Sequence, residues 1–152
     1  MFASEQSDGG KVDRIFDVIY ASKGLYQELL RPVCRKYDLT DSEIMILLFL
    51  SDGTDRNTAT DIVIGRRIKK SVVSASLKDL QDRGLISGYY LEGNHRSLHL
   101  KVNESASEII SEAKKVREDC YGLLTEGLDR KEKNDLRAYL KIVNENITRY
   151  RK

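Results

Sequence analysis

The sequence predicts a mainly α-helical fold, of minor α+β character, with one small β-hairpin. Apolar residues recur at helical spacing over most of the 152 residues. The exception is SGYYLEGNHRSLHLKV, from Ser87 to Val102, which alternates apolar and polar residues on either side of a turn at residues 92–95. This hairpin comes directly after a lysine-containing helical segment, and that order of elements restricts the number of possible folds.

Length and composition indicate a charged, folded chain without a membrane span. The chain is 40% hydrophobic and 33% charged, which is unlike a disordered protein. No apolar run approaches the roughly 20 residues that a membrane-spanning helix requires. Residues 1–11 are small, polar and acidic and lack the apolar segment of a signal peptide, so we expect a flexible tail. The two cysteines are too few for a disulfide framework, and we expect a cytoplasmic protein.

Residues 12–39 are predicted to form one long N-terminal helix. Its apolar residues lie on one face: Ile15, Ile19, Tyr26, Leu30, Val33 and Tyr37. Pro32 is expected to kink or end this helix, because proline lacks a backbone N–H and its ring clashes with the preceding turn.

Two capped helices are predicted next. The letters TDSE, starting at Thr40, form a capping box in which the threonine hydroxyl accepts from the backbone N–H of Glu43. The helix that follows is almost wholly apolar, so we expect it to be buried on most sides. A second helix, of about two turns, starts at Thr58 and ends at residues 65–67.

A third helix and the hairpin complete this region. The helix is predicted over Val72–Arg83, with Ser71 as its cap and Gly84 as its end. Its apolar face consists of Val73, Leu77 and Leu80. The strands are predicted over Leu85–Leu91 and Ser97–Val102.

Residues 103–152 are predicted to form two long helices. The first begins near Asn103 or Ser105, and the second is capped by Asp129. The two helices carry apolar stripes: Ile109, Ala113, Val116, Cys120 and Leu123, then Leu136, Leu140, Val143, Ile147 and Tyr150. Stripes of this size are rarely left exposed on a monomer, so we expect a two-fold homodimer.

The elements within residues 40–102 together make a winged helix-turn-helix, a shape that fits duplex DNA. The major groove admits one helix, whose first residues approach the base edges and must be small or polar. Lysines at the start of that helix suit phosphates, and a narrow minor groove attracts an arginine at the hairpin tip. The predicted DNA-binding residues are Lys69, Lys70, Ser71, Val72, Ser74, Ala75, Lys78, Asn94, His95 and Arg96.

The charge distribution agrees with this prediction. The chain has a net charge of only +2, but the segment from residue 66 to residue 101 carries +5, which leaves −3 for the remainder. Its basic residues are Arg66, Arg67, Lys69, Lys70, Lys78, Arg83, Arg96 and Lys101. A local positive excess is where an anionic polymer would dock.

Four stretches, in their order and spacing, resemble the MarR family of bacterial transcriptional regulators over roughly residues 12–150. They are LTDSE from Leu39, KSVVS from Lys70, LQDRGLI from Leu80, and NHR followed by LHL from Asn94. The resemblance implies a winged helix-turn-helix with N- and C-terminal dimerisation helices, residues 12–39 and 103–152. It also implies a homodimer on a palindromic operator, a repressor relieved by a small anionic or phenolic ligand, with no cofactor.

The resemblance also assigns roles to single residues. It places Ser71, Val72, Ser74 and Ala75 in the major-groove reading segment and makes Arg96 the wing arginine. The family usually has an aspartate that orients this arginine, where the present chain has Asn94. Two further departures are Ala75, where a longer polar side chain is common, and the pair Asn103 and Ala106 at the start of the next helix.

Three other interpretations remain open from the sequence. The winged helix could bind protein instead of DNA. Cys34, which neighbours Arg35 and Lys36, could be a redox-sensing thiolate, whereas Cys120 lies on an apolar stripe and is expected to be packed. An effector pocket could lie where the dimerisation helices meet the DNA-binding lobe, lined by Tyr26, Tyr37 or Phe49.

A metal site and an enzyme are disfavoured. His95 and His99 lie four residues apart in a strand, about 13 Å along it, too far to share one ion. The sequence has no nucleophile elbow, phosphate loop or clustered acid pair, so we expect a binding protein with no metal and no catalytic residues.

Overall fold

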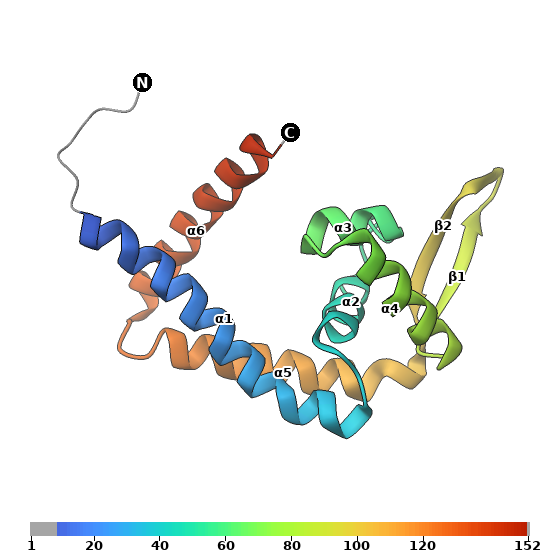
Figure 1. The fold of residues 1–152 in the computed structure, drawn as a ribbon, viewed down its shortest axis with the longest axis horizontal. Coiled ribbons are helices and arrows are strands. Elements are labelled where there is room, and N and C mark those ends of the chain that lie inside the picture. Colours follow the sequence, from blue (N-terminus) through green and yellow to red (C-terminus); the bar gives the residue numbers. More distant parts are fainter. Residues whose placement is uncertain (1–8, 152) are drawn as a thin grey trace. The chain divides into compact units, whose positions relative to one another are not determined.

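The computed structural model describes residues 9–151 (Figure 1). The predicted tail before Gly9 lies outside the described residues. The chain divides into two compact units, one up to Glu118 and one from Asp119 onward. Within the described residues, no helix has the combined length and apolar character that crossing a bilayer requires.

The first unit holds most of the secondary structure. Its elements are α1 (Gly9–Tyr37), α2 (Asp41–Ser51), α3 (Ala59–Arg66), α4 (Lys70–Asp82), β1 (Ile86–Leu91), β2 (Asn94–Val102), η1 (Glu104–Ala106) and the start of α5 (Ser107–Leu124). The second unit contains the end of α5 and α6 (Arg130–Tyr150). The predicted mainly helical fold with one antiparallel hairpin is confirmed.

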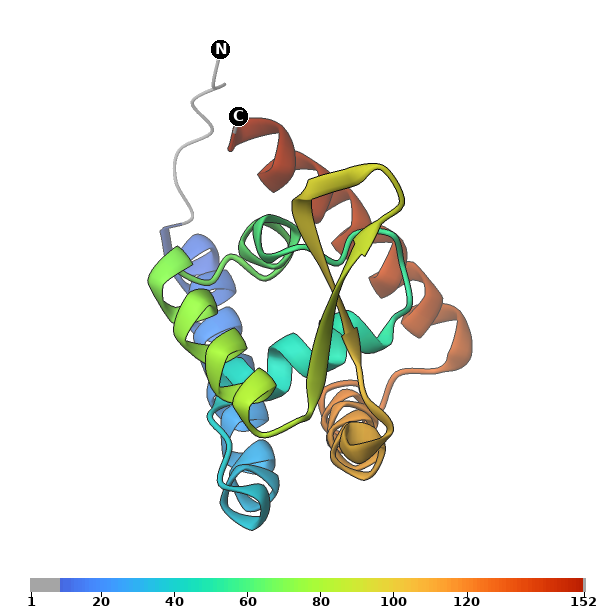
Figure 2. The ribbon, with the colours of Figure 1, turned by 90° about the vertical axis from the view of Figure 1, so that its right-hand side faces the viewer.

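α2 forms the centre of the first unit. Ile44, Ile46 and Leu47 are completely buried, as predicted from the apolar run. Every neighbouring element contributes buried side chains to the same cluster: Leu30, Ile62, Val73, Leu80, Ile86, Leu100 and Ile109. Figure 2 shows α2 crossing behind the wing, beside α4. Both parts of the predicted DNA-binding surface therefore rest on one buried helix.

The predicted N-terminal caps are largely confirmed. Thr40 and Glu43 form a reciprocal capping box at α2. Thr58 and Asp61 do the same at α3, where the backbone N–H of Asp61 donates to the Thr58 hydroxyl at 3.2 Å. These contacts satisfy backbone donors that a helix start leaves without partners, so the sequence fixes where both helices begin.

The cap of α4 differs from the prediction. α4 begins at Lys70 with Lys69 as its N-cap, and no side chain caps it. Ser71 lies one residue inside the helix. The reason is the turn before it: Arg67 takes the left-handed conformation, with φ of +55°, and ends α3 so that the chain turns early into α4. The first N–H groups of α4 are left for an outside partner.

Pro32 does not end α1, which was one of the two effects predicted for it. α1 begins three residues earlier than expected and continues through Pro32 to Tyr37. Pro32 is exposed, so water can satisfy the carbonyl that loses its helical partner. The helix ends where Asp38 turns left-handed and the Arg83 guanidinium donates to the carbonyls of Tyr37 and Asp38, at 2.5 and 2.7 Å.

The second unit is built around the turn between α5 and α6. The hydroxyl of Thr125, which is buried, donates to the carbonyl of Tyr121 at 2.7 Å. The guanidinium of Arg137 lies 5.2 Å from the centre of the Tyr121 ring. α6 is capped by Asp129, as predicted. Its apolar residues are exposed in the single chain: Tyr139, Leu140, Ile142, Val143, Ile147 and Tyr150.

The capping box of α3 yields a stability prediction. We expect Thr58→Ala to lower the free energy of unfolding by about 1 kcal/mol, because it removes a side-chain acceptor for the first turn. Urea denaturation followed by circular dichroism measures this change. Thr54→Ala, four residues earlier at an exposed position, is the matched control and should change stability by less than about 0.5 kcal/mol. Equal losses in the two variants would contradict the role of the cap.

Candidate nucleic-acid interface

α4 presents the predicted reading face to the outside of the first unit. Four of its side chains are buried toward α2 and α3: Val73, Ser76, Leu77 and Leu80. The predicted contact residues are all exposed: Ser71, Val72, Ser74, Ala75 and Lys78. Because the exposed side chains at the helix start are small, another surface can approach the backbone of α4 closely.

Two lysines stand at the start of this face. Lys69 and Lys70 are exposed, and neither has a hydrogen-bond or ion-pair partner among the described residues. The uncapped N–H groups of α4 add the positive end of the helix dipole at the same place. Lysines and free N–H groups together suit a phosphate.

Three other basic residues of the segment are engaged within the protein. Lys78 donates to Asp82 at 2.7 Å, and this hydrogen bond raises its pKa. Arg83 caps α1, as described above. Arg66 is partly enclosed: its side chain is 25% exposed, its guanidinium lies 5.3 Å from the Phe49 ring centre, and burial lowers its pKa. The charge count therefore overstates how much positive charge faces solvent.

The wing is a two-stranded antiparallel hairpin that holds the remaining predicted contacts. β1 and β2 pair from Ile86↔Val102 to Leu91↔Asn94. The turn between them needs glycine, since Gly93 has φ of +75°. β2 is longer than predicted because Asn94, His95 and Arg96 extend the strand instead of forming a loose loop.

Arg96 is exposed, and its guanidinium has no partner among the described residues. The Asn94 side chain does not hold that guanidinium; its Oδ1 accepts from the backbone N–H of Arg96 at 3.0 Å. Asn94 therefore contacts the strand backbone and leaves the arginine side chain unpaired. The His95 ring lies 5.3 Å from the Tyr90 ring across the hairpin. This aromatic pair was not foreseen, because the strand register was unknown.

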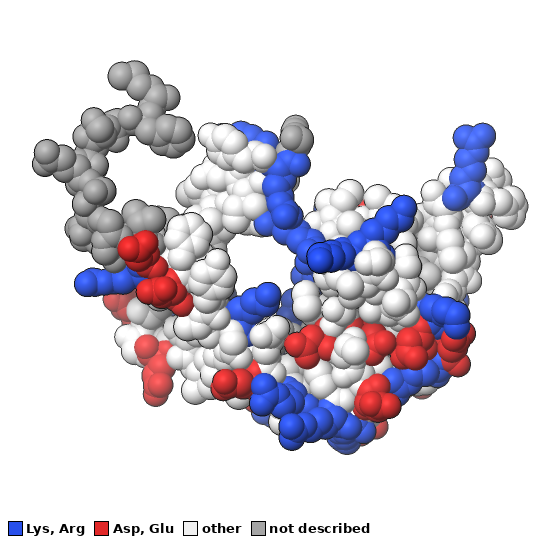
Figure 3. All heavy atoms as spheres, viewed as in Figure 1, with Lys and Arg blue, Asp and Glu red and all other residues white. Residues whose placement is uncertain are grey.

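The space-filling view agrees with this distribution of charge. Figure 3 shows basic side chains projecting from the wing and from the region of α3 and the start of α4, while the acidic side chains seen on this lobe form a band below them. In this view, both groups of basic side chains lie on the same side of the acidic band.

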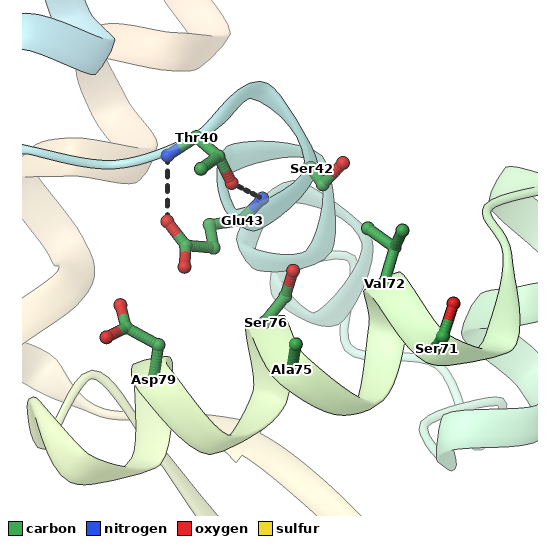
Figure 4. A pocket seen from close by; sticks show the side chains of 8 residues that line it. All are labelled: Thr40, Ser42, Glu43, Ser71, Val72, Ala75, Ser76 and Asp79. Carbon is green, nitrogen blue, oxygen red and sulfur yellow. Dashed lines mark hydrogen bonds between the residues drawn. The ribbon is translucent and has the colours of Figure 1, made fainter.

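An open groove of about 500 Å³ separates α4 from the start of α2. Figure 4 shows Val72 and Ser76 pointing from α4 toward α2. Carboxylates stand farther along the groove: Glu43 accepts from the backbone N–H of Thr40, and Asp79 lies 3.8 Å from Arg83. These carboxylates repel phosphates, so an anionic polymer would meet the first half of α4.

A second groove, between α3 and α4, brings in a residue that the sequence analysis missed. It is lined by Ala59, Thr60, Val63, Lys70, Val73 and Ser74. Thr60 is exposed in the first turn of α3, beside two predicted contacts, Lys70 and Ser74. The cap at Thr58 was the available signal, since it marks a second helix start near the same surface.

The described residues contain no group of three or more histidine, cysteine or acidic side chains placed to hold a metal ion. His99 is engaged elsewhere, with its Nδ1 2.6 Å from the Oδ1 of Asn57. The surface consists of small, polar and cationic groups, which bind by shape and charge.

Comparison with known families gives a sequence match over the lobe. Residues 37–91 match a model of the MarR family. This range covers the end of α1, all of α2, α3 and α4, and β1. The chain matches none of the curated proteins with which it was compared.

Comparison with solved structures extends the likeness beyond the lobe. A MarR-family transcriptional regulator from Listeria monocytogenes, complexed with a 26-mer DNA, is 19% identical, with a TM-score of 0.78 and 88% of each chain covered. The Staphylococcus aureus MepR–DNA complex is 18% identical, with a TM-score of 0.71, covering 93% of this chain and 99% of that chain.

A third structure, of Bordetella bronchiseptica BpsR, concerns regulation of its DNA binding by 6-hydroxynicotinic acid. It is 13% identical, with a TM-score of 0.67, covering 86% of this chain and 98% of that chain. The resemblance to the MarR family is therefore confirmed, by the sequence match over residues 37–91 and by a fold shared with MarR-family regulators over most of the chain.

Proposed function

We propose that this chain is a transcriptional regulator that binds double-stranded DNA as a homodimer on a palindromic operator. In this proposal α4 enters the major groove and the wing follows the adjacent minor groove. The chain binds and does not catalyse, and it acts in the bacterial cytoplasm, where its DNA is. Two of the similar structures are DNA complexes, which supports the choice of partner.

One observation carries the proposal: unpaired cations flank a small, exposed helix face. Lys69 and Lys70 stand at the uncapped start of α4, and Arg96 stands on the wing. Lys78, by contrast, is already paired with Asp82. The unpaired groups match the two places where a winged helix meets phosphates and the minor groove.

The homodimer is supported by apolar residues that each unit leaves exposed. In the first unit, α1 exposes Ile15, Phe16, Val18, Ile19 and Tyr20, each by more than half of its surface. In the second unit, the exposed apolar residues of α6 have no partner within that unit. A second copy would bury both sets, so we assign residues 12–39 and 103–152 to dimerisation.

Relief of repression by a small anionic or phenolic ligand is part of the proposal. The BpsR structure provides an example of DNA binding regulated by an aromatic acid. In this chain, Phe49 lies beneath the partly enclosed guanidinium of Arg66. A cation over an aromatic ring suits a small anionic aromatic ligand. Tyr37 is less suited to such a ligand, because its hydroxyl already donates to Glu112 at 2.8 Å.

The thiol-sensing alternative is disfavoured by the surroundings of Cys34. Its thiol donates to the carboxylate of Asp41 at 3.3 Å. Burial, followed by this hydrogen bond and the charge of Asp41, raises the pKa of Cys34 to about 11. Burial also raises the pKa of Cys120, which is packed as predicted. A redox sensor needs a lowered thiol pKa, so neither cysteine is suited to that role.

Selection of bound sequences from random duplexes tests the proposal directly. We expect a two-fold symmetric site whose half-sites lie about 34–36 Å apart, one turn of the duplex, because two reading helices are related by the dimer axis. Sedimentation of the free protein should show a dimer at micromolar concentration. A protein-binding winged helix would select no duplex at any salt concentration, and a stable monomer would remove the palindrome from the proposal.

Arg96→Ala tests the wing. We expect it to weaken DNA binding about tenfold and to lower the slope of log affinity against log salt by about one, because one ionic contact is lost. Fluorescence anisotropy at several salt concentrations measures both. Lys78→Ala is the comparison: Lys78 is also a predicted contact, but its ammonium is already paired with Asp82, so the slope should change less. Unchanged affinity in Arg96→Ala would show that the wing does not contact DNA.

Cys34 is expected to react slowly with iodoacetamide. A pKa of about 11 instead of 9.0 lowers the thiolate fraction near neutral pH by about a hundredfold, since each pKa unit is a factor of ten. Mass spectrometry of a Cys120→Ser protein measures the rate against a short cysteine peptide. Asp41→Asn removes the nearby charge and should accelerate the reaction. A rate equal to that of the peptide would restore the redox interpretation.

A further inference from the structure

Asn57 joins the wing to the segment that leads into α3. It lies between α2 and α3 and is half-buried. Its backbone carbonyl accepts from the N–H of Leu100 on β2 at 2.9 Å. Its side chain reaches both strands: Nδ2 donates to the hydroxyl of Tyr89 on β1 at 2.9 Å, and Oδ1 lies 2.6 Å from Nδ1 of His99 on β2.

These contacts leave little freedom to the side chains involved. Tyr89 and His99 are partners in the strand register, and their rings lie 5.6 Å apart. Because the amide nitrogen of Asn57 faces Tyr89, its oxygen faces His99, which then donates from Nδ1. One asparagine is therefore hydrogen-bonded to both strands and satisfies two other polar side chains.

The position of Asn57 in the chain links these contacts to the reading helix. Thr58, the next residue, caps α3, and the left-handed turn at Arg67 joins α3 to α4. In the other direction, Arg96 lies three residues from His99 along β2, about 10 Å. A two-stranded hairpin is marginally stable by itself, so its direction depends on what holds its base.

We propose that Asn57 is a positioning residue for DNA binding, which fixes the wing relative to α4 so that Arg96 and the start of α4 reach neighbouring grooves together. This inference rests on the proposed function. Asn57 itself touches no base or phosphate in this account. It acts through Tyr89 and His99, and its loss lets the wing move away from the position in which Arg96 binds.

A double-mutant cycle tests this role with four proteins: the wild type, Asn57→Ala, Arg96→Ala and the double variant. DNA affinity and its salt dependence are measured on the selected duplex. Arg96→Ala should weaken binding about tenfold in the wild type, but less than about threefold in the Asn57→Ala background. A wing that keeps only the backbone bond from Leu100 to residue 57 no longer holds Arg96 in its binding position. If Asn57 had only a structural role, Asn57→Ala would lower stability, and the loss of DNA affinity caused by Arg96→Ala would be the same with and without it.

Two further variants make the test specific. Ser87→Ala is the matched control: it removes the hydrogen bond from Ser87 to Asn103 in the same hairpin without touching Asn57. Arg96→Ala should keep its full effect in that background. Asn57→Asp retains acceptors for His99 and for the Tyr89 hydroxyl, so the dependence on Arg96 should return. If Asn57→Ala does not fold, Tyr89→Phe replaces it in the cycle with Arg96→Ala. This variant removes only the tyrosine hydroxyl and leaves Asn57 intact.

The possible results separate the two claims. Equal losses from Arg96→Ala with and without Asn57 would overturn the positioning role while leaving DNA binding intact. Failure of the wild type to bind any duplex would overturn both the proposed function and this inference. Interdependent losses with Asn57→Ala or Tyr89→Phe, absent with Ser87→Ala, would support the role of Asn57.

Discussion

Burial of α2 is the constraint on which the rest of the first unit depends. Its apolar residues face in several directions, so they cannot be covered by one neighbour. α1, α3, α4 and β2 all pack against it, and each contributes one face to the same cluster. α4 therefore has its inner face fixed by packing, and its outer face is left small and polar. The exposed reading face follows from how α2 is covered.

Positive charge in this chain has two different uses, and a count along the sequence does not separate them. Arg83 caps the end of α1, and Arg66 lies over Phe49, so both stabilise the fold. Lys69, Lys70 and Arg96 have no such partners among the described residues. A cation that is already paired gains less from a phosphate, because it must first give up an existing contact. The few unpaired groups matter more for binding than the total.

Features of the fold that depend on neighbouring residues were predictable from the sequence. The capping boxes at Thr40 and Thr58 and the buried face of α4 rest on spacings of three or four residues. Pro32 misled, because its effect depends on whether water reaches the freed carbonyl. Ser71 misled because the turn at Arg67 sets where α4 begins, and no local pattern predicts a left-handed arginine.

Contacts between residues that are distant in the sequence could not be predicted either, because no local pattern indicates them. Asn94 stands where the family usually has an orienting aspartate, but its side chain accepts from the backbone N–H of Arg96 and does not contact the guanidinium. Asn57 and His99 are 42 residues apart, and no motif joins them. Likewise, nothing adjacent to Cys34 in sequence indicates a raised pKa, since Arg35 and Lys36 suggest the opposite and the effect comes from burial and Asp41.

Rigidity of the wing explains why such a distant contact matters for recognition. A hairpin that moves freely must be ordered when it binds, and that loss of freedom reduces the affinity gained from its arginine. If Asn57 holds the base of the wing as we propose, folding, and not binding, orders the backbone. The Arg96 guanidinium is not held by Asn94, so in the proposed complex it is available to enter a minor groove. In the proposed complex, a fixed backbone with an unpaired arginine side chain suits a wing that reads the shape of DNA, while α4 would read the bases.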